Sequence, residues 1–196
     1  MRLATCAPED DGPIYMLNLM KYRERADYGG ETPSEQGVSG READDLYSPV
    51  DVLAKIGAAP VFMGEVLSAS EDWDRVAVVR YATRRSFIEM QSRDDFKEKH
   101  VHKDAGMDHT IVLGSLPVAE VPPRAKPNRL LLELWRDADA APAGDGTDFT
   151  VEGTIIGDGR TWSRVRWTTL AEGAPVPDGD EAHQVLVVQP GIDTWR

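Results

Sequence analysis

The order of strand-like and helix-like segments along the first 120 residues constrains the fold most. Four segments are short, rich in apolar residues and bounded by polar or glycine-containing turns, as strands are. They cover residues 13–20, 59–68, 75–82 and 110–118. Two other segments, residues 41–57 and 84–103, place apolar side chains three or four residues apart, as one face of a helix requires. The sequence therefore predicts the order β-α-β-β-α-β.

Both helical segments contain a signal for a break. Pro49 lies inside residues 41–57, so the first helix either begins there or is kinked there. Ser92 and Asp94 offer a side-chain cap for a second helical piece within residues 84–103.

The β-α-β-β-α-β order is typical of a ferredoxin-like α+β fold, in which both helices cover one face of a four-stranded antiparallel sheet. The other face would carry alternate residues of all four strands, many of them apolar, and a face of that size has to be covered. Pairing with a second copy of the chain is a common solution. We therefore expect residues 1–120 to form a ferredoxin-like domain and a homodimer, a dimeric α+β barrel.

The remainder of the chain has a different pattern. Residues 121–128 contain three prolines and are predicted to form a linker. Four strand-like segments follow, with a hairpin turn at residues 157–160; they are residues 130–135, 149–156, 161–170 and 183–188. We expect residues 129–196 to form a small antiparallel β-meander that packs on the first domain or on its dimer partner.

Charge and cysteine content exclude several classes of partner. The net charge is −12, from 34 acidic and 22 basic residues. Neither part of the chain is basic, so we expect no nucleic-acid surface and no binding to an anionic membrane. No stretch approaches the about 18 apolar residues of a membrane helix. Cys6 is the single cysteine, which suits a cytoplasmic location; it is either a reactive thiol or an incidental terminal residue.

A series of short motifs between residues 12 and 118 carries a resemblance to a known family. The motifs are Gly12-Pro13 with Met16-Leu17-Asn18-Leu19, Gly40-Arg41-Glu42-Ala43 with Tyr47, Val61-Phe62-Met63-Gly64-Glu65 with Trp73-Asp74, Val78-Val79-Arg80-Tyr81, Ser86-Phe87-Ile88-Glu89-Met90, Asp95-Phe96 and His102-Lys103. This part of the chain resembles the domain of unknown function 1330 family of the dimeric α+β barrel superfamily. Phe96 and Lys103 stand where that family usually has a tyrosine and an arginine. The resemblance implies a fold and a dimer, but no single activity, because the superfamily includes monooxygenases, polyketide cyclases, lactone isomerases and haem enzymes.

Asn18 is the most informative polar residue, because it interrupts an otherwise apolar strand. A buried amide needs hydrogen-bond partners, so Asn18 is either tied to the backbone or aimed into a cavity. Tyr22, Tyr47, Trp73 and Arg80 each combine an apolar body with a polar end and could line the same cavity. Ordinary packing is the alternative for these four.

Three histidines, His100, His102 and His109, lie within ten residues. Helical residues two apart point about 200° away from each other, so one metal ion could not bind both members of the H-x-H pair. We predict no metal site. One histidine could instead act as an acid or base in a cleft, the alternative being exposed positions near a helix end. No nucleotide-binding or other cofactor motif occurs, so no cofactor is predicted.

These residues predict a cofactor-free enzyme that acts on an aromatic or polyketide-like small molecule in the cleft between sheet and helices. Asn18 and Arg80 would polarise a carbonyl or enolate, and His102, or else His100, would move a proton. Aromatic side chains would shape the walls, namely Tyr22, Tyr47 and Trp73. Isomerisation, cyclisation and cofactor-free oxygenation all fit these roles. A non-catalytic ligand-binding or stress-associated protein using the same pocket, and an interaction module whose β-rich tail binds a partner, are the alternatives.

Overall fold

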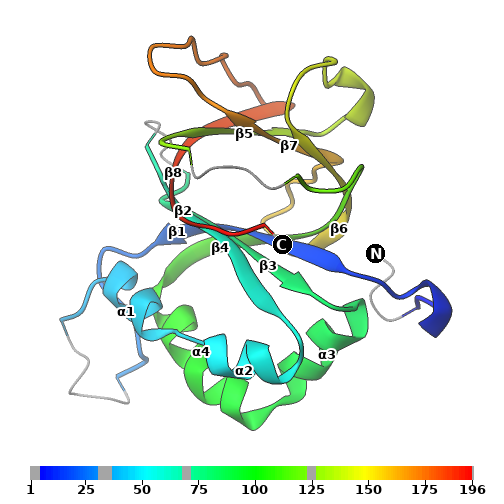
Figure 1. The fold of residues 1–196 in the computed structure, drawn as a ribbon. Helices are drawn as coiled ribbons and strands as arrows, with labels where there is room; N and C mark the ends of the chain where they lie inside the picture. Colours follow the sequence, from blue (N-terminus) through cyan, green and yellow to red (C-terminus); the bar gives the residue numbers. More distant parts are fainter. Residues whose placement is uncertain (1–4, 31–36, 68–71, 123–126, 196) are drawn as a thin grey trace.

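The strands of the whole chain form one closed antiparallel barrel. The computed structural model describes residues 5–30, 37–67, 72–122 and 127–195. Its strand order is β1-β3-β2-β8-β5-β7-β6-β4, with β4 pairing back to β1. The strands are β1 (Ile14–Tyr22), β2 (Ala59–Val66), β3 (Arg75–Tyr81), β4 (Met107–Pro117), β5 (Leu130–Trp135), β6 (Thr147–Ile156), β7 (Arg164–Thr169) and β8 (His183–Asp193). Figure 1 shows the barrel standing on a layer of helices.

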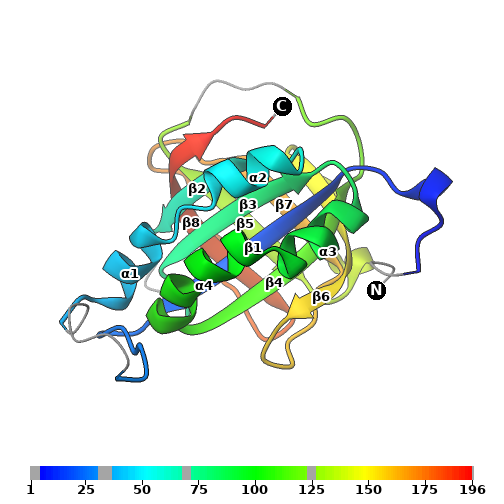
Figure 2. The ribbon, with the colours of Figure 1, turned by 90° about the horizontal axis from the view of Figure 1, so that it is seen from below.

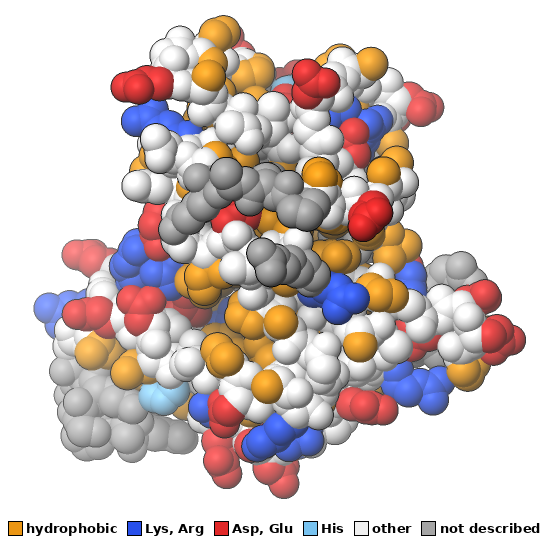
Figure 3. Space-filling view, viewed as in Figure 1, with side chains coloured by type: hydrophobic (Ala, Val, Ile, Leu, Met, Phe, Trp, Pro, Cys, Tyr) orange, Lys and Arg blue, Asp and Glu red, His pale blue; other side chains and the backbone are white. Residues whose placement is uncertain are grey.

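The helical layer covers the outer face of the first four strands (Figure 2). The helices are α1 (Gly40–Leu46), α2 (Val50–Lys55), α3 (Arg84–Ser92) and α4 (Asp94–Gly106), and short 3-10 turns occur at η1 (Pro8–Asp10) and η3 (Ala138–Ala140). The space-filling view shows hydrophobic side chains reaching the surface where the barrel meets this layer (Figure 3).

Each predicted helical segment is divided in two. Ser39 and Glu42 form a capping box at the start of α1, and α2 starts directly after Pro49. The second break falls at Arg93, which precedes α4 but gives it no side-chain cap, so the cap predicted from Ser92 and Asp94 is absent. Thr83 caps α3 instead.

The first seven residues of β1 are buried, because the strand has one face in the barrel and the other against the helices. Leu17 lies opposite Val78 of β3 and Leu113 of β4, and all three belong to the barrel core. Met16 belongs to the separate core beneath the helices. Burial on both faces explains why the β1 sequence is a continuous apolar run rather than an alternating one.

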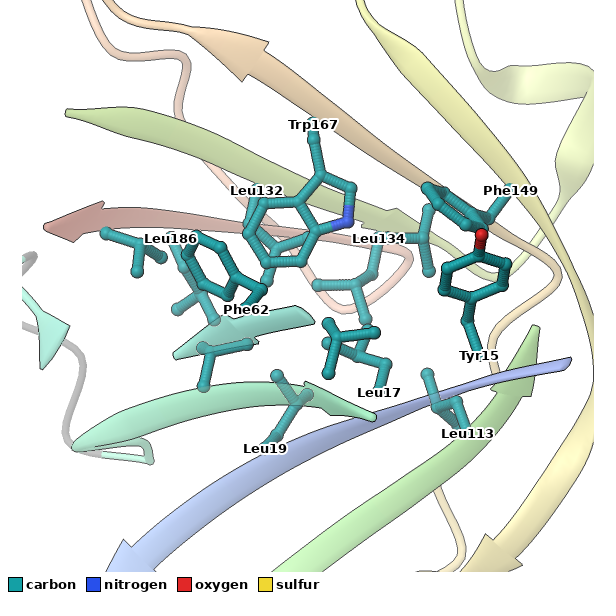
Figure 4. Close-up of a cluster of buried hydrophobic side chains, with 14 of the residues drawn as sticks. Tyr15, Leu17, Leu19, Phe62, Leu113, Leu132, Leu134, Phe149, Trp167 and Leu186 are labelled. Atoms are coloured by element: carbon teal, nitrogen blue, oxygen red, sulfur yellow. The ribbon is translucent and has the colours of Figure 1, made fainter. Parts of the chain in front are cut away.

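Aromatic side chains from both halves of the chain fill the barrel interior (Figure 4). The ring centres of Phe62 and Trp167 are 4.6 Å apart, and those of Tyr15 and Phe149 are 5.4 Å apart. Trp195, beyond β8, packs on Phe62 and Trp167. The interior is therefore a packed core.

The predicted fold class, a ferredoxin-like dimeric α+β barrel followed by a β-meander, is wrong. β6 pairs with β4 and β8 pairs with β2, so the four strands within residues 130–193 join both edges of the first sheet and close it. β5 pairs with β7 and β8 rather than with β6, which is not a meander. The apolar face expected to meet a second copy is covered by the chain's own strands, because closing the barrel pairs both edges of the sheet and buries its inner face. The reason for expecting a dimeric barrel is thereby removed.

Strands from both predicted parts, residues 1–120 and 129–196, share this sheet. Residues 123–126 of the predicted linker lie outside the described residues. Within the described ranges, no helix combines the length and the apolar character needed to cross a bilayer.

Candidate functional site

A cavity of about 590 Å³ lies between the helical layer and the outer face of β1–β4. Five of the six methionines of the chain line it; they are Met16, Met20, Met63, Met90 and Met107. Methionine side chains are flexible and polarisable, and they pack well against aromatic rings. The walls therefore suit a planar, mostly apolar molecule whose shape the side chains can follow.

Aromatic and aliphatic residues complete the apolar walls, among them Tyr81, Phe87 and Phe96. Val50, Ile156 and Ile192 also line the cavity, and they are among the exposed large hydrophobic residues of the protein. An apolar molecule could therefore contact hydrophobic side chains from the surface inward.

Asn18 and Lys103 meet in this cavity, one from β1 and the other from α4. The Asn18 side chain is buried; its amide nitrogen donates to the Met16 carbonyl oxygen at 3.0 Å. Its amide oxygen accepts from the Lys103 ammonium at 3.3 Å. Asn18 is thus both tied to the backbone and aimed into the cavity, and its oxygen positions the lysine.

The Lys103 ammonium also lies 5.5 Å from the centre of the Tyr47 ring. Burial lowers the pKa of Lys103, and the carboxylates of Asp44 and Asp104 oppose this effect without cancelling it. Burial raises the pKa of the Tyr47 hydroxyl, with Asp44 contributing in the same direction. Burial therefore shifts the protonation equilibrium of both side chains toward the uncharged form.

His100 lies one helical turn before Lys103 on α4 and also lines the cavity. Its Nδ1 is 3.0 Å from an Asp104 carboxylate oxygen, and its ring packs against Tyr47 and Phe96. The His100 side chain keeps 29% exposure, so it can exchange protons with water. The carboxylate–imidazole pair and the lysine thus occupy one side of one helix.

A charged cluster forms one end of the cavity. Arg75 donates to Asp44 at 3.1 Å, to Asp45 at 2.8 Å and to Glu65 at 3.0 Å. The Tyr22 hydroxyl donates to the same Asp44 oxygen at 2.6 Å. Burial, reinforced by Asp44, raises the pKa of Tyr22. Since these groups satisfy one another, the cluster is an end wall rather than a reactive group.

Three of the predicted site residues face away from the cavity. Arg80 is paired with Tyr15, a barrel-core residue, so its side chain starts on the barrel side of the sheet. Trp73 is buried in the barrel core. His102 shares a hydrogen bond of 2.9 Å with the Tyr28 hydroxyl through its Nδ1.

The structure therefore brings together Asn18, Tyr47 and His100 from the predicted set. It does not bring Arg80, Trp73 or His102 to them, and Tyr22 does not line the cavity itself but packs behind its wall, against Met20, Ala77 and Met107, and bonds to Asp44.

Sequence reasoning missed Lys103 and Arg75 as cavity residues. Phe96, His100 and Lys103 are spaced four and three residues apart, the spacing of one helix face, which could have identified Lys103. Arg75 is two residues from Ala77 in the same strand, so both point to the cavity side.

Among the residues that the structure describes, no group of three or more His, Cys, Asp or Glu side chains could hold a metal ion. No protein-family model matches the chain, and no curated protein matches it. Among solved structures, the chain is similar to RPA0582, a protein of unknown function from Rhodopseudomonas palustris, with 29% identity, a TM-score of 0.45, and coverage of 54% of this chain and 84% of that one. The methylated RPA0582 protein gives 28% identity, a TM-score of 0.46, and coverage of 54% and 82%. Similarity of this extent assigns neither fold nor function.

Proposed function

We propose that the protein is a cofactor-independent enzyme, an isomerase or cyclase, that moves a proton next to the carbonyl group of an aromatic or polyketide-like molecule. The observation that carries this proposal is the meeting of Lys103 and Asn18 inside a methionine-lined cavity. The apolar walls would hold the carbon skeleton of the molecule, and Lys103 would donate a hydrogen bond to its carbonyl oxygen.

Lys103 supplies the donor that such a reaction needs. Removing a proton next to a carbonyl places negative charge on the carbonyl oxygen. A hydrogen-bond donor held in place in a site of low dielectric stabilises that charge strongly. The amide nitrogen of Asn18 is already bonded to the Met16 carbonyl, so Asn18 serves as a positioning residue and Lys103 as the donor.

His100 is the proton carrier that shares one helix face with Lys103. An imidazole accepts and donates protons near neutral pH, and the Asp104 carboxylate holds the ring through Nδ1. Its place at the edge of the cavity gives it access both to the ligand and to water.

Proton exchange tests the proposal without knowledge of the natural substrate. A panel of bicyclic and monocyclic aryl ketones, led by 2-tetralone, is incubated with the protein in D₂O, and the loss of the proton signal beside the carbonyl is followed by NMR. The wild type should accelerate exchange above buffer. His100→Gln should slow it by about 100-fold or more, because a positioned acid or base typically contributes that much.

His102→Gln is the matched control, since it changes the same residue type on the same helix but away from the cavity. It should leave exchange unchanged. Equal loss in both variants, or no effect of His100→Gln, would contradict the assigned role.

A non-catalytic ligand-binding protein is the second candidate, favoured by the predominance of methionine and aromatic side chains in the walls. It predicts that ketones of the panel bind to the cavity, as observed by native mass spectrometry, and that none of them exchanges its proton faster than in buffer. That result would reject the enzyme.

A further inference from the structure

Lys103 differs from the other lysines that the structure describes. Each of the others forms an ion pair with a carboxylate; the pairs are Lys21–Asp74, Lys55–Asp95, Lys97–Asp94 and Lys99–Asp51. Within the same described ranges, Lys103 forms no ion pair, and its nitrogen contacts a neutral amide oxygen and an aromatic ring. A lysine inside a cavity without a carboxylate partner is costly to keep charged.

This setting shifts the protonation equilibrium of Lys103 toward the neutral amine. Burial lowers the pKa of Lys103, with Asp44 and Asp104 acting in the opposite direction. The neutral amine, unlike the ammonium ion, has a free electron pair and attacks carbonyl carbons. The amide oxygen of Asn18 fixes the nitrogen at the wall where a ligand would lie.

We propose that Lys103 is a nucleophile that forms an imine with an aldehyde or ketone bound in the cavity. This inference rests on the proposed function for the position of the carbonyl group and names the substrate class more narrowly. It also assigns covalent chemistry to a residue that the proposed function uses only as a hydrogen-bond donor.

The covalent step balances without any further reagent. The Lys103 nitrogen forms a bond to the carbonyl carbon, and the carbon–oxygen double bond opens to give a carbinolamine. The remaining carbon–oxygen bond then breaks, and the oxygen leaves as water with the two hydrogens of the neutral amine. Once protonated, the imine withdraws electrons from the neighbouring carbon, which makes the proton there easier to remove. His100 is the group placed to move that proton.

Reductive trapping tests the nucleophile directly. The protein is incubated with benzaldehyde at pH 7, reduced with sodium borohydride, digested and mapped by mass spectrometry. Lys103 should carry the benzyl group more often than the exposed Lys97, because a lowered pKa leaves more of the neutral amine at pH 7. Labelling of Lys97 equal to or greater than that of Lys103 would overturn the proposal.

Two variants refine the test. Lys103→Arg should lose the label, whereas Lys99→Arg, one turn earlier on α4, should keep it. If circular dichroism shows that Lys103→Arg does not fold, Lys103→Met replaces it. The ratio of benzyl labelling at Lys103 to that at Lys97 in the wild-type protein tests the proposal without any variant.

Benzaldehyde has no hydrogen on the carbon next to its carbonyl, so labelling does not depend on proton transfer. If Lys103 is labelled but no ketone exchanges its proton faster than in buffer, Lys103 is a nucleophile and the proposed proton-transfer enzyme is rejected. If the protein accelerates proton exchange of 2-tetralone but Lys103 is not labelled, the proposed enzyme activity stands and the role of Lys103 as a nucleophile is rejected.

Discussion

Replacing Arg75 by methionine should lower the free energy of unfolding strongly. The size of the loss follows from how deeply its three ion-pair partners are buried. Side-chain exposure is 7% for Asp44, 35% for Glu65 and 56% for Asp45, while Arg75 itself is 7% exposed. An exposed pair such as that with Asp45 contributes about 0–1 kcal/mol. The pair with Asp44 is buried on both sides and dominates the loss.

Without Arg75, the Asp44 carboxylate would be buried with the Tyr22 hydroxyl as its remaining bonded partner in the cluster. Breaking a buried pair from one side costs about 3–5 kcal/mol. That is a large part of the about 5–15 kcal/mol by which domains are usually stable. The double change Arg75→Met with Asp44→Asn removes both charges, so it should recover most of the loss.

Urea unfolding followed by tryptophan fluorescence gives the free energies of unfolding of the wild type, both single variants and the double variant. A loss below about 1 kcal/mol for Arg75→Met, or a double variant as unstable as the single one, would refute the reasoning about the buried pair.

Three further predictions concern the cavity lysine, the contact between α1 and α4, and the barrel core. Lys103→Met should stabilise the protein by about 1 kcal/mol at low pH. Because the pKa of Lys103 is lower in the folded than in the unfolded protein, the wild type gains stability as pH rises, and the difference between the two proteins should vanish above about pH 10.4. A difference in the free energy of unfolding that grew with pH in urea titrations would contradict this sign. Gly106→Ala should lower stability by about 1–3 kcal/mol in thermal unfolding, because its Cβ would lie near the Gly40 carbonyl oxygen and force α1 from α4; Gly12→Ala, whose Cβ meets nothing within 4 Å, should be neutral. Trp167→Ala should cost about 3–5 kcal/mol in urea unfolding, and a cost under about 1 kcal/mol would argue against a packed barrel interior.

The sequence located the elements well but not their assembly. Hydrophobic patterning placed β5 at residues 130–135 and β3 within one residue of its observed end, because patterning reports which faces are buried. It carries no information on which segment covers a face. The closure depends on backbone hydrogen bonds from β6 to β4 and from β8 to β2, and these form between segments of almost any β-prone sequence.

The candidate site was partly predictable for similar reasons. A lone amide in an apolar strand marked Asn18, because a buried amide must be satisfied. Arg80 was misplaced although strand alternation separates it from Ala77, three residues away on the other face. For the H-x-H pair, geometry allowed one histidine at most in the cavity, and α4 has too few apolar residues to show which. Only the structure selects His100 over His102.

The central claim is that a carbonyl compound occupies the methionine-lined cavity beside Lys103. Titration of protein carrying ¹³C-methyl methionine with 2-tetralone tests it most directly, because five methyl groups report from the walls of that one space. We expect the signals of Met16, Met20, Met63, Met90 and Met107 to shift together and saturably in the wild type. Saturable binding of the ketone that left these five signals unmoved would place the ligand elsewhere and contradict the claim.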